Sequence, residues 1–438
     1  MNDRVHKNDV IVIGGGFVGL ACAYELALQG ISVTVLEKDD DIGGLASSFR
    51  VNGQRLENFY HHWFNNDQSL LQLVRELGCE ENLLYRPTKT TVYLKNKFFR
   101  LSTPLDILRF TPLSFLGRIR LGLLVLQARR IKDYKQIEGI TAREWLLKLC
   151  GPEVYKVVWE PLLRGKFGAV ADEISAVWFW NKLVLRGGSR SKAGGEELVY
   201  YRGGFGALAQ EIANAIKSAG GMVETGVNVE ALLVEDGCVK GVETSQGRIN
   251  AWAVIATCDL PAIADLAAPH VTDTYVEQLR KIRYLANVSL VLELSHNLSD
   301  IYWLNVNDPD FPFVGVIEHT NFEPAQTYGG THIVYLSKYL PESAELYQMN
   351  REQLFKYSLP YIKQMFPEFD RSSVLHYHVF KAPYAQPVVE CHYSQLIPEN
   401  ETPIKGFYIA SMAQIYPEDR GTNYAIRQGR SIGRLVAK

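Results

Sequence analysis

Glycines near the amino terminus have the spacing of a phosphate-binding turn. An apolar run ends at Gly14, Gly16 and Gly19 complete a Gly-x-Gly-x-x-Gly pattern, and Glu37 closes the next apolar run. The first glycine permits a tight turn, the second lets the backbone approach a pyrophosphate, and the third lets a helix pack closely on the sheet. Amides at the start of that helix face phosphates, and a carboxylate about twenty residues downstream is placed to bind a ribose. The pattern predicts a βαβ unit that holds a dinucleotide.

The residues after Glu37 indicate that the bound dinucleotide contains a flavin. Lys38 is followed by three aspartates and then by a second glycine pair, Gly43-Gly44, which a nicotinamide-binding domain of this type does not need. Together the two motifs resemble the flavin-containing amine oxidase superfamily, which includes protoporphyrinogen oxidase, phytoene desaturase and monoamine oxidase. The resemblance implies bound FAD, with the glycine pair beside its pyrophosphate. Leu45 departs from the pattern, because many members have arginine after the pair.

Two later segments resemble the rest of the superfamily's nucleotide domain. In that domain the backbone at the Val229 position meets the adenine, and a helix that begins near Gly421 points at the flavin pyrimidine edge, where negative charge gathers on reduction. The family usually has Gly-Asp after the last strand, whereas this chain has Ser411-Met412, which leaves that contact open. The residues expected to hold FAD are Gly14, Gly16, Phe17, Val18, Gly19, Glu37, Lys38, Gly43, Gly44, Leu45, Ala46, Val229, Ser411, Gly421, Thr422 and Asn423.

Other loops carry candidates for the flavin face and the substrate pocket. Residues 57–64, with His61 and His62, are similar to the stretch that crosses the isoalloxazine ring, and they also resemble a segment of UDP-galactopyranose mutase. Tyr384 follows the pattern of an Ala-x-Pro segment in protoporphyrinogen oxidase, and Arg164 is available to an anionic substrate. Packing or solvation explains such side chains at least as simply. No catalytic base is assigned, and without a carboxylate or cysteine cluster near the histidines we expect no metal.

Composition indicates a globular chain. Its 438 residues, 47% of them hydrophobic, can fill sizeable cores. A net charge of -2 leaves no global field that would recruit nucleic acid. Six scattered cysteines form no Cys-x-x-Cys pair, and the polar first residues do not resemble a signal peptide, so we expect a cytoplasmic protein with a small-molecule substrate. The oligomeric state stays open.

The segment 104–132 combines an apolar helix with arginines. Its longest apolar stretch, 121–126, is far shorter than the ~20 residues that cross a bilayer. A basic amphipathic helix can lie on a membrane surface, but such helices are also common in globular cores. We therefore expect a core helix with solvated arginine ends, and peripheral membrane contact is the less favoured alternative.

The expected fold is α/β, a discontinuous Rossmann-like FAD-binding domain with an inserted α+β substrate domain. The FAD-binding domain would comprise residues 1–83, 202–265 and 404–438, and the substrate domain 84–201 and 266–403. The first insertion has mostly helical patterns, whereas runs such as 287–294 alternate apolar and polar residues and predict an antiparallel sheet. The resemblance implies six or seven strands facing the flavin, and a pocket between the domains is common.

Three functions fit these expectations. The leading hypothesis is an FAD-dependent oxidoreductase that oxidises a C–N or C–C bond of a bulky, partly hydrophobic small molecule by hydride transfer to flavin N5. The first alternative is a flavin-dependent nucleotide-sugar mutase, motivated by residues 61–64 and by the basic loops near Arg164 and Arg190. The second is a non-catalytic binding protein like the GDP-dissociation inhibitors, against which the intact glycines and Glu37 argue. The electron acceptor, oxygen or a quinone, stays open.

Overall fold

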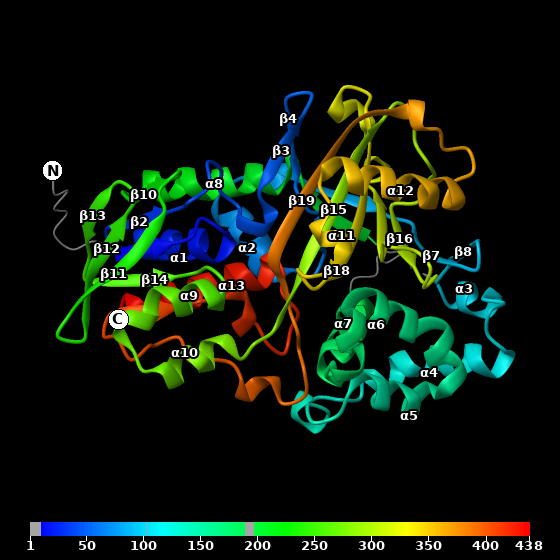
Figure 1. The fold of residues 1–438 in the computed structure, drawn as a ribbon, viewed down its shortest axis with the longest axis horizontal. Helices are drawn as coiled ribbons and strands as arrows, with labels where there is room; N and C mark the ends of the chain where they lie inside the picture. The colour runs from blue at the N-terminus through cyan, green and yellow to red at the C-terminus, as the bar shows by residue number, and fades with distance from the viewer. Residues whose placement is uncertain (1–9, 102, 189–196) are drawn as a thin grey trace.

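A five-stranded parallel sheet forms the nucleotide-binding part of the molecule (Figure 1). The computed structural model describes residues 10–101, 103–188 and 197–438. In sheet order the strands are β10 (Met222–Glu224), β2 (Val33–Leu36), β1 (Val10–Ile13), β14 (Ala253–Ala256) and β20 (Phe407–Ile409). Because they come from three separate stretches of sequence, the sheet is assembled across both insertions.

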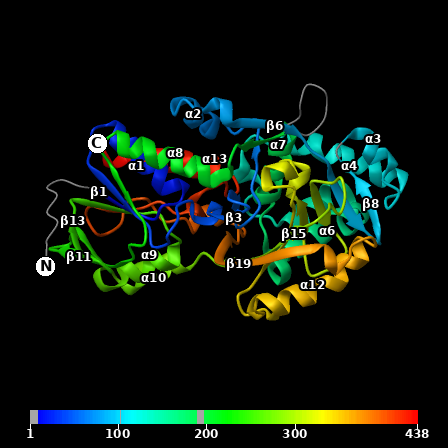
Figure 2. The same cartoon turned by 90° about the horizontal axis from the view of Figure 1, so that it is seen from above.

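Successive residues of the central strands pack against opposite layers. Val10 and Val12 belong to one apolar core, whereas Ile11 and Ile13 belong to another. This period of two, with both faces apolar, is what a strand covered by helices on both sides requires. Figure 2 shows one layer of helices on each side. The first layer contains α1 (Phe17–Leu28), α8 (Gly204–Ser218) and α13 (Thr422–Val436), and the second contains α9 (Leu260–Ala267) and α10 (Asp273–Arg280).

The inserted part is built on a seven-stranded sheet. In sheet order its strands are β19 (Val374–Pro387), β15 (Tyr284–Leu294), β18 (His332–Leu340), β17 (Gly315–Glu318), β16 (Trp303–Val306), β7 (Thr90–Leu94) and β8 (Lys97–Arg100). The predicted antiparallel sheet is present, with one difference: β16 and β7 pair in parallel. That pair joins the two insertions, so neither insertion forms the sheet alone.

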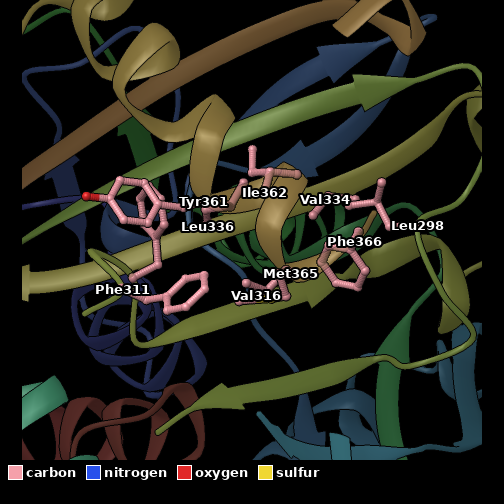
Figure 3. Close-up of a pocket in the computed structure, with 10 residues that line it drawn as sticks. Leu298, Phe311, Val316, Val334, Leu336, Tyr361, Ile362, Met365 and Phe366 are labelled. Atoms are coloured by element: carbon pink, nitrogen blue, oxygen red, sulfur yellow. The ribbon is translucent and has the colours of Figure 1, made fainter. Parts of the chain in front are cut away.

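One face of this sheet packs against α12 (Arg351–Met365), near the short α11 (Glu345–Gln348). Figure 3 shows apolar side chains of the helix and the sheet turned toward one another. The space among them is about 10 Å³, lined by Leu298, Phe311, Phe313, Val316, Val334, Leu336, Tyr361, Ile362, Met365 and Phe366. A space of that size holds a single water at most, so this is a packed core and not a ligand site.

The remaining elements connect or flank the two large sheets. Three small sheets contain β3 (Ser48–Val51) with β4 (Gln54–Glu57), β5 (Trp63–Phe64) with β9 (Glu197–Tyr201) and β6 (Leu83–Pro87), and β11 (Val229–Glu235) with β12 (Cys238–Thr244) and β13 (Gly247–Asn250). The helices are α2 (Gln68–Glu76), α3 (Pro104–Arg109), α4 (Phe115–Ala128), α5 (Ala142–Val154), α6 (Glu160–Phe167) and α7 (Ala176–Gly188). The fold class is the predicted one. The domain limits stay a prediction, and β6 spans the limit placed at residue 83.

Among the described residues, no helix has the length and apolar character that crossing a membrane would need.

Candidate cofactor and active site

Glycines at the end of β1 fix how closely α1 approaches the sheet. Gly14 has φ +105°, a conformation that favours glycine, and a Cβ on Gly19 would lie 2.0 Å from the Gly14 carbonyl oxygen. Any other residue at position 19 would push the helix off the strand. Gly16 is the N-cap of α1, no side chain caps the helix, and its first turn contains no acidic residue. The positive end of this helix is therefore available to an anion.

The second glycine pair lies against the first motif. Gly16 and Gly43 form a parallel backbone bridge, and the Gly43 amide donates to the Gly15 carbonyl at 2.9 Å. A Cβ on Gly44 would stand 3.2 Å from the Gly16 Cα, so side chains would fill the space between the two segments. A 3-10 turn over Gly44–Ala46, which includes Leu45, continues the chain. A cradle of bare backbone beside an uncapped helix start fits the pyrophosphate of FAD.

Glu37 lies at the carboxyl end of β2, beside this cradle. Its Oε2 accepts from the Gly15 amide at 2.7 Å and its Oε1 from the Asp39 amide at 3.0 Å. Its carbonyl accepts from the Val227 amide at 2.8 Å, which holds the start of β11, with Val229, at this edge of the sheet. The carboxylate is thus fixed where a ribose is expected. Lys38 follows it on the exposed side of the loop.

The amino end of α13 is tied to the loop that contains the two histidines. Gly421 is its N-cap, with no side-chain cap, and the first turn contains no acidic residue. Thr422 accepts a hydrogen bond from the Trp63 indole, and Asn423 accepts from the Leu70 amide at 3.1 Å. Ser411, buried after β20, accepts at its carbonyl from Gln428 of the same helix at 3.0 Å. These contacts place a second uncapped helix start where developing negative charge would be stabilised.

A cavity of about 160 Å³ opens at this helix end. It is lined by Tyr60, His61, His62, Trp63, Phe64, Asp67, Lys182, Trp303, Asp419, Arg420, Gly421, Thr422, Asn423 and Tyr424. The structure thus brings both predicted histidines together with the predicted Gly421, Thr422 and Asn423, although these residues lie at opposite ends of the sequence.

Both histidines are held by hydrogen bonds. His61 Nδ1 donates to the Phe59 carbonyl at 2.6 Å, and burial lowers the pKa of His61 to about 4 despite that bond. His62 Nδ1 shares a hydrogen bond of 3.0 Å with the Tyr302 hydroxyl, and its ring stands edge-on to Trp303. His61 is therefore neutral at physiological pH. Among the described residues, no group of three or more histidine, cysteine or acidic side chains could hold a metal ion.

A buried charge cluster in the cavity wall was not predicted. Asp419 accepts from Lys182 at 2.6 Å, and Lys166 lies 3.8 Å away. Burial alone would raise the pKa of Asp419, but Lys182, Lys166 and the neighbouring Arg420 hold it below its ordinary value. Arg420 donates to the Tyr339 hydroxyl at 2.7 Å. The one sequence signal that could have indicated this cluster is the position of Asp419 and Arg420 directly before the predicted Gly421.

Two other candidates lie elsewhere. Tyr384 stands edge-on to Tyr284, with ring centres 5.4 Å apart, and does not line the cavity. Arg164 lies on helix α6 and not in a loop as expected; it pairs with Glu160 and Asp172 at the surface and does not line the cavity either, so the interpretation of a solvated cation fits better. Arg190, invoked for the mutase alternative, lies outside the described residues.

Known proteins are similar to this chain in sequence or in fold. The model of the flavin containing amine oxidoreductase family matches residues 17–435. Amine oxidase [flavin-containing] B of Sus scrofa is 30% identical over 220 residues, which are 47% of this chain and 42% of that enzyme. The match thus spans less than half of that relative.

Two solved structures cover nearly the whole chain. An oxidoreductase from Methanosarcina mazei has a TM-score of 0.77 at 21% identity, over 97% of this chain and 99% of its own. A reduced UDP-galactopyranose mutase has a TM-score of 0.76 at 14% identity, over 99% and 94%. At these identities the likeness shows a shared fold. The extent of the family match and the glycine cradle lead to one conclusion: this chain belongs to the flavin containing amine oxidoreductase family, and its cofactor is FAD.

Proposed function

We propose that this protein oxidises a C–N or C–C single bond of a bulky, partly hydrophobic small molecule by hydride transfer from a substrate carbon to N5 of FAD. When bound, FAD supplies the two-electron acceptor. The substrate carbon loses a hydride, and a proton leaves the adjacent nitrogen or carbon, so that a C=N or C=C bond remains. The observation that carries the proposal is the aromatic lining of the cavity at the amino end of α13.

The aromatic walls favour a dry site. Tyr60, Trp63 and Trp303 line the cavity, and Tyr60 stands edge-on to Trp303 with ring centres 4.9 Å apart. Flat, rigid rings bind large apolar groups with little loss of side-chain freedom and exclude water from the reacting atoms. Neutral His61 adds no charge to this wall. Oxidation of a neutral amine requires no strong base, and we assign no residue as a catalytic base.

The cationic part of the cavity wall, Lys182 and Arg420, favours a substrate with an anionic group. Lys182 and Arg420 line the cavity together with two acidic residues, Asp67 and Asp419, and Asp419 pairs with Lys182. Lys166 lies 3.8 Å from Asp419, so three cations surround the Asp419 carboxylate and outnumber the two carboxylates of Asp419 and Asp67. A net positive wall next to aromatic rings suits an amphiphile whose carboxylate or phosphate contacts Arg420 while its apolar part lies among the rings.

The same cationic wall supports a second candidate, a flavin-dependent nucleotide-sugar mutase. A nucleotide diphosphate is an anion of the kind that Arg420 and Lys182 would bind. In this case no net oxidation of the substrate takes place. The two candidates differ in what happens to the flavin over one turnover, which makes them separable.

Anaerobic mixing of the oxidised holoenzyme with candidate substrates tests the proposal. The substrates are hydrophobic amines, porphyrinogens and polyenes with and without a carboxylate, and UDP-sugars. Net oxidation predicts loss of the flavin absorbance with one equivalent of product, faster for the carboxylated members. Conversion of a UDP-sugar only by dithionite-reduced enzyme, with no change in flavin redox state, would replace the proposal with the mutase.

A pair of variants checks the cationic wall. Lys182→Gln is expected to raise KM about tenfold for anionic substrates with little change for neutral ones. Lys356→Gln is the matched control, because that lysine is exposed and pairs with Glu352 on α12. Equal KM values for all three proteins would exclude an anionic group from the proposal while leaving the oxidation itself in place.

A further inference from the structure

The surface formed by α3, α4 and β8 exposes many large apolar side chains. On α3 these are Leu105 and Leu108, and on α4 they are Phe115, Leu116, Ile119, Leu123 and Leu126. Each is between 39% and 68% exposed. Figures 1 and 2 both place these elements at one end of the molecule, far from the nucleotide-binding sheet. We call this surface the α3–α4 face. A contiguous apolar patch of this kind usually marks an interaction site.

Helix α4 is apolar on two opposite sides. At about 100° per residue, its exposed residues from Phe115 to Leu126 fall within an arc of about 100°. Its buried residues, among them Leu121, Leu124 and Ala128, lie on the other side, which packs against α5 and α7. A helix that only completed the core would need a single apolar side. The exposed apolar side chains on the second side belong to none of the apolar cores of the described residues.

Basic residues flank the exposed arc. Arg118 and Arg120 fall on either side of it by the same helical geometry, and Arg129 and Arg130 follow the helix. Residues 97–132 contain eight lysines or arginines and a single acidic residue, Asp106, in a chain whose net charge is -2. The positive charge of this region is therefore local. This positive charge lies in the same region as the exposed leucines and phenylalanine, whereas the molecule as a whole has a slightly negative net charge.

We propose that the α3–α4 face docks on an anionic lipid surface, with Phe115, Leu116 and Leu123 inserted among the acyl chains and the arginines at the headgroups. Exposed apolar residues flanked by arginine are what an interfacial helix requires. A second copy of the chain suits the face less well, because a twofold contact would bring the same basic residues against one another. The sequence alone favours a core helix over peripheral membrane contact for residues 104–132. With the exposed apolar side of α4 in view, we favour membrane contact.

This docking has a consequence for the cavity. Helix α7 packs against α4 and carries Lys182, which lines the cavity. The helical wall of the cavity is thus one helix away from the proposed lipid surface. An amphiphilic substrate could then pass from the bilayer to the site with a short path through water.

Flotation of the FAD-loaded protein with vesicles tests the proposal. The probes are phosphatidylcholine vesicles with and without phosphatidylserine, at low and high salt. We expect binding only with phosphatidylserine, weakened by salt. Phe115→Ser/Leu123→Ser/Leu126→Ser should weaken binding about tenfold or more, with the FAD content and Tm retained. The control Leu28→Ser/Trp252→Ser/Leu375→Ser removes equally exposed apolar residues elsewhere and should bind as the wild type does.

Three results would overturn the proposal. One is absence of vesicle binding by the wild type. Another is a wild-type dimer that the α3–α4 triple variant dissociates, which would assign the face to a second copy of the chain. The third is an equal loss of binding in the control variant, which would show that no particular face is used.

Discussion

Gly429 of α13 lies against the backbone of Val18 in α1. A Cβ on Gly429 would stand 2.2 Å from the Val18 carbonyl oxygen, closer than any side chain allows. The two helices that meet here are the ones whose uncapped amino ends face the FAD cradle and the cavity. Their spacing therefore sets the distance between the two positively polarised helix ends.

Gly429→Ala is expected to lower the free energy of unfolding by about 3 kcal/mol, because a backbone carbonyl cannot move aside as a flexible side chain does. The FAD content should fall with it, since both helix ends shift. Ser431→Ala, at an exposed position of the same helix, is the control. Urea unfolding of the three proteins measures the effect, and a Gly429→Ala protein as stable as the control would show that the helices separate freely.

Asp419→Asn should cost about 3 kcal/mol of stability at neutral pH, because it leaves Lys182 and Lys166 beside an uncharged group in a buried wall. The pKa of Asp419 is lowered in the folded chain, so its contribution is complete above its ordinary pKa of 3.8 and is lost only in stronger acid. The loss should therefore be the same from about pH 5 to about pH 8.

Asp172→Asn is the matched control for Asp419. Asp172 also forms an ion pair, with Arg164, but 38% of its side chain is exposed, so its change should cost less than about 1 kcal/mol. Denaturant unfolding of both variants at several pH values makes the comparison. Equal losses would mean that the Asp419 cluster behaves as a surface ion pair.

The raised pKa of the Glu57 carboxyl predicts that the free energy of unfolding falls as pH rises. Burial raises its pKa to about 7 from an ordinary 4.5, although the Phe205 amide and the Tyr200 hydroxyl donate to it. Between these values the unfolded chain has released this proton and the folded chain retains it, so increasing pH favours unfolding. The penalty is absent below pH 4.5 and reaches about 3 kcal/mol above pH 7.

Glu57→Gln removes that titration while keeping an acceptor for the Phe205 amide. Its advantage over the wild type in unfolding free energy should grow by about 3 kcal/mol between about pH 4.5 and about pH 7.5. Glu81→Gln, at the surface, is the control. A difference that stays constant over this range would show that Glu57 is already ionised in the folded protein.

His62→Ala should change the visible absorption maxima and the reduction potential of the bound flavin. The ring lies in the cavity with Gly421 and Thr422 and is fixed by Tyr302, so its removal alters the polarity and water content at this helix end. His296→Ala changes an exposed histidine and should leave the spectrum unaltered. If spectra and potentials are identical in all three proteins, His62 only packs in the protein and does not influence the flavin.

Local sequence was enough for the features that depend on neighbours in the chain. The glycine turn, the helix after it and the alternating strands follow from spacing and period. The hydrogen bond from Trp63 to Thr422 could not be predicted, because 359 residues separate the two. Asp419 was missed because a charged loop residue is usually solvated, and only tertiary packing buries it here.

The α3–α4 face shows another limit. The apolar and basic residues of 104–132 were recognised, but a helix with apolar residues on two sides does not reveal which side the core covers. That choice is made by α5 and α7, which pack against Leu121, Leu124 and Ala128. The surface therefore became visible only in the folded chain.

The most direct test of the account compares the FAD content of the wild type and Gly16→Trp, purified side by side and assayed by visible absorption and chromatography of the released chromophore. A Cβ on Gly16 would meet only Gly44 Cα, at 3.9 Å, so the fold tolerates a side chain whose bulk enters the cradle. We predict one FAD per wild-type chain, almost none in Gly16→Trp, and similar unfolding of the two apoproteins; Leu28→Trp, an exposed control, should retain FAD. Full FAD in Gly16→Trp, or a wild type that never binds FAD, would contradict the account.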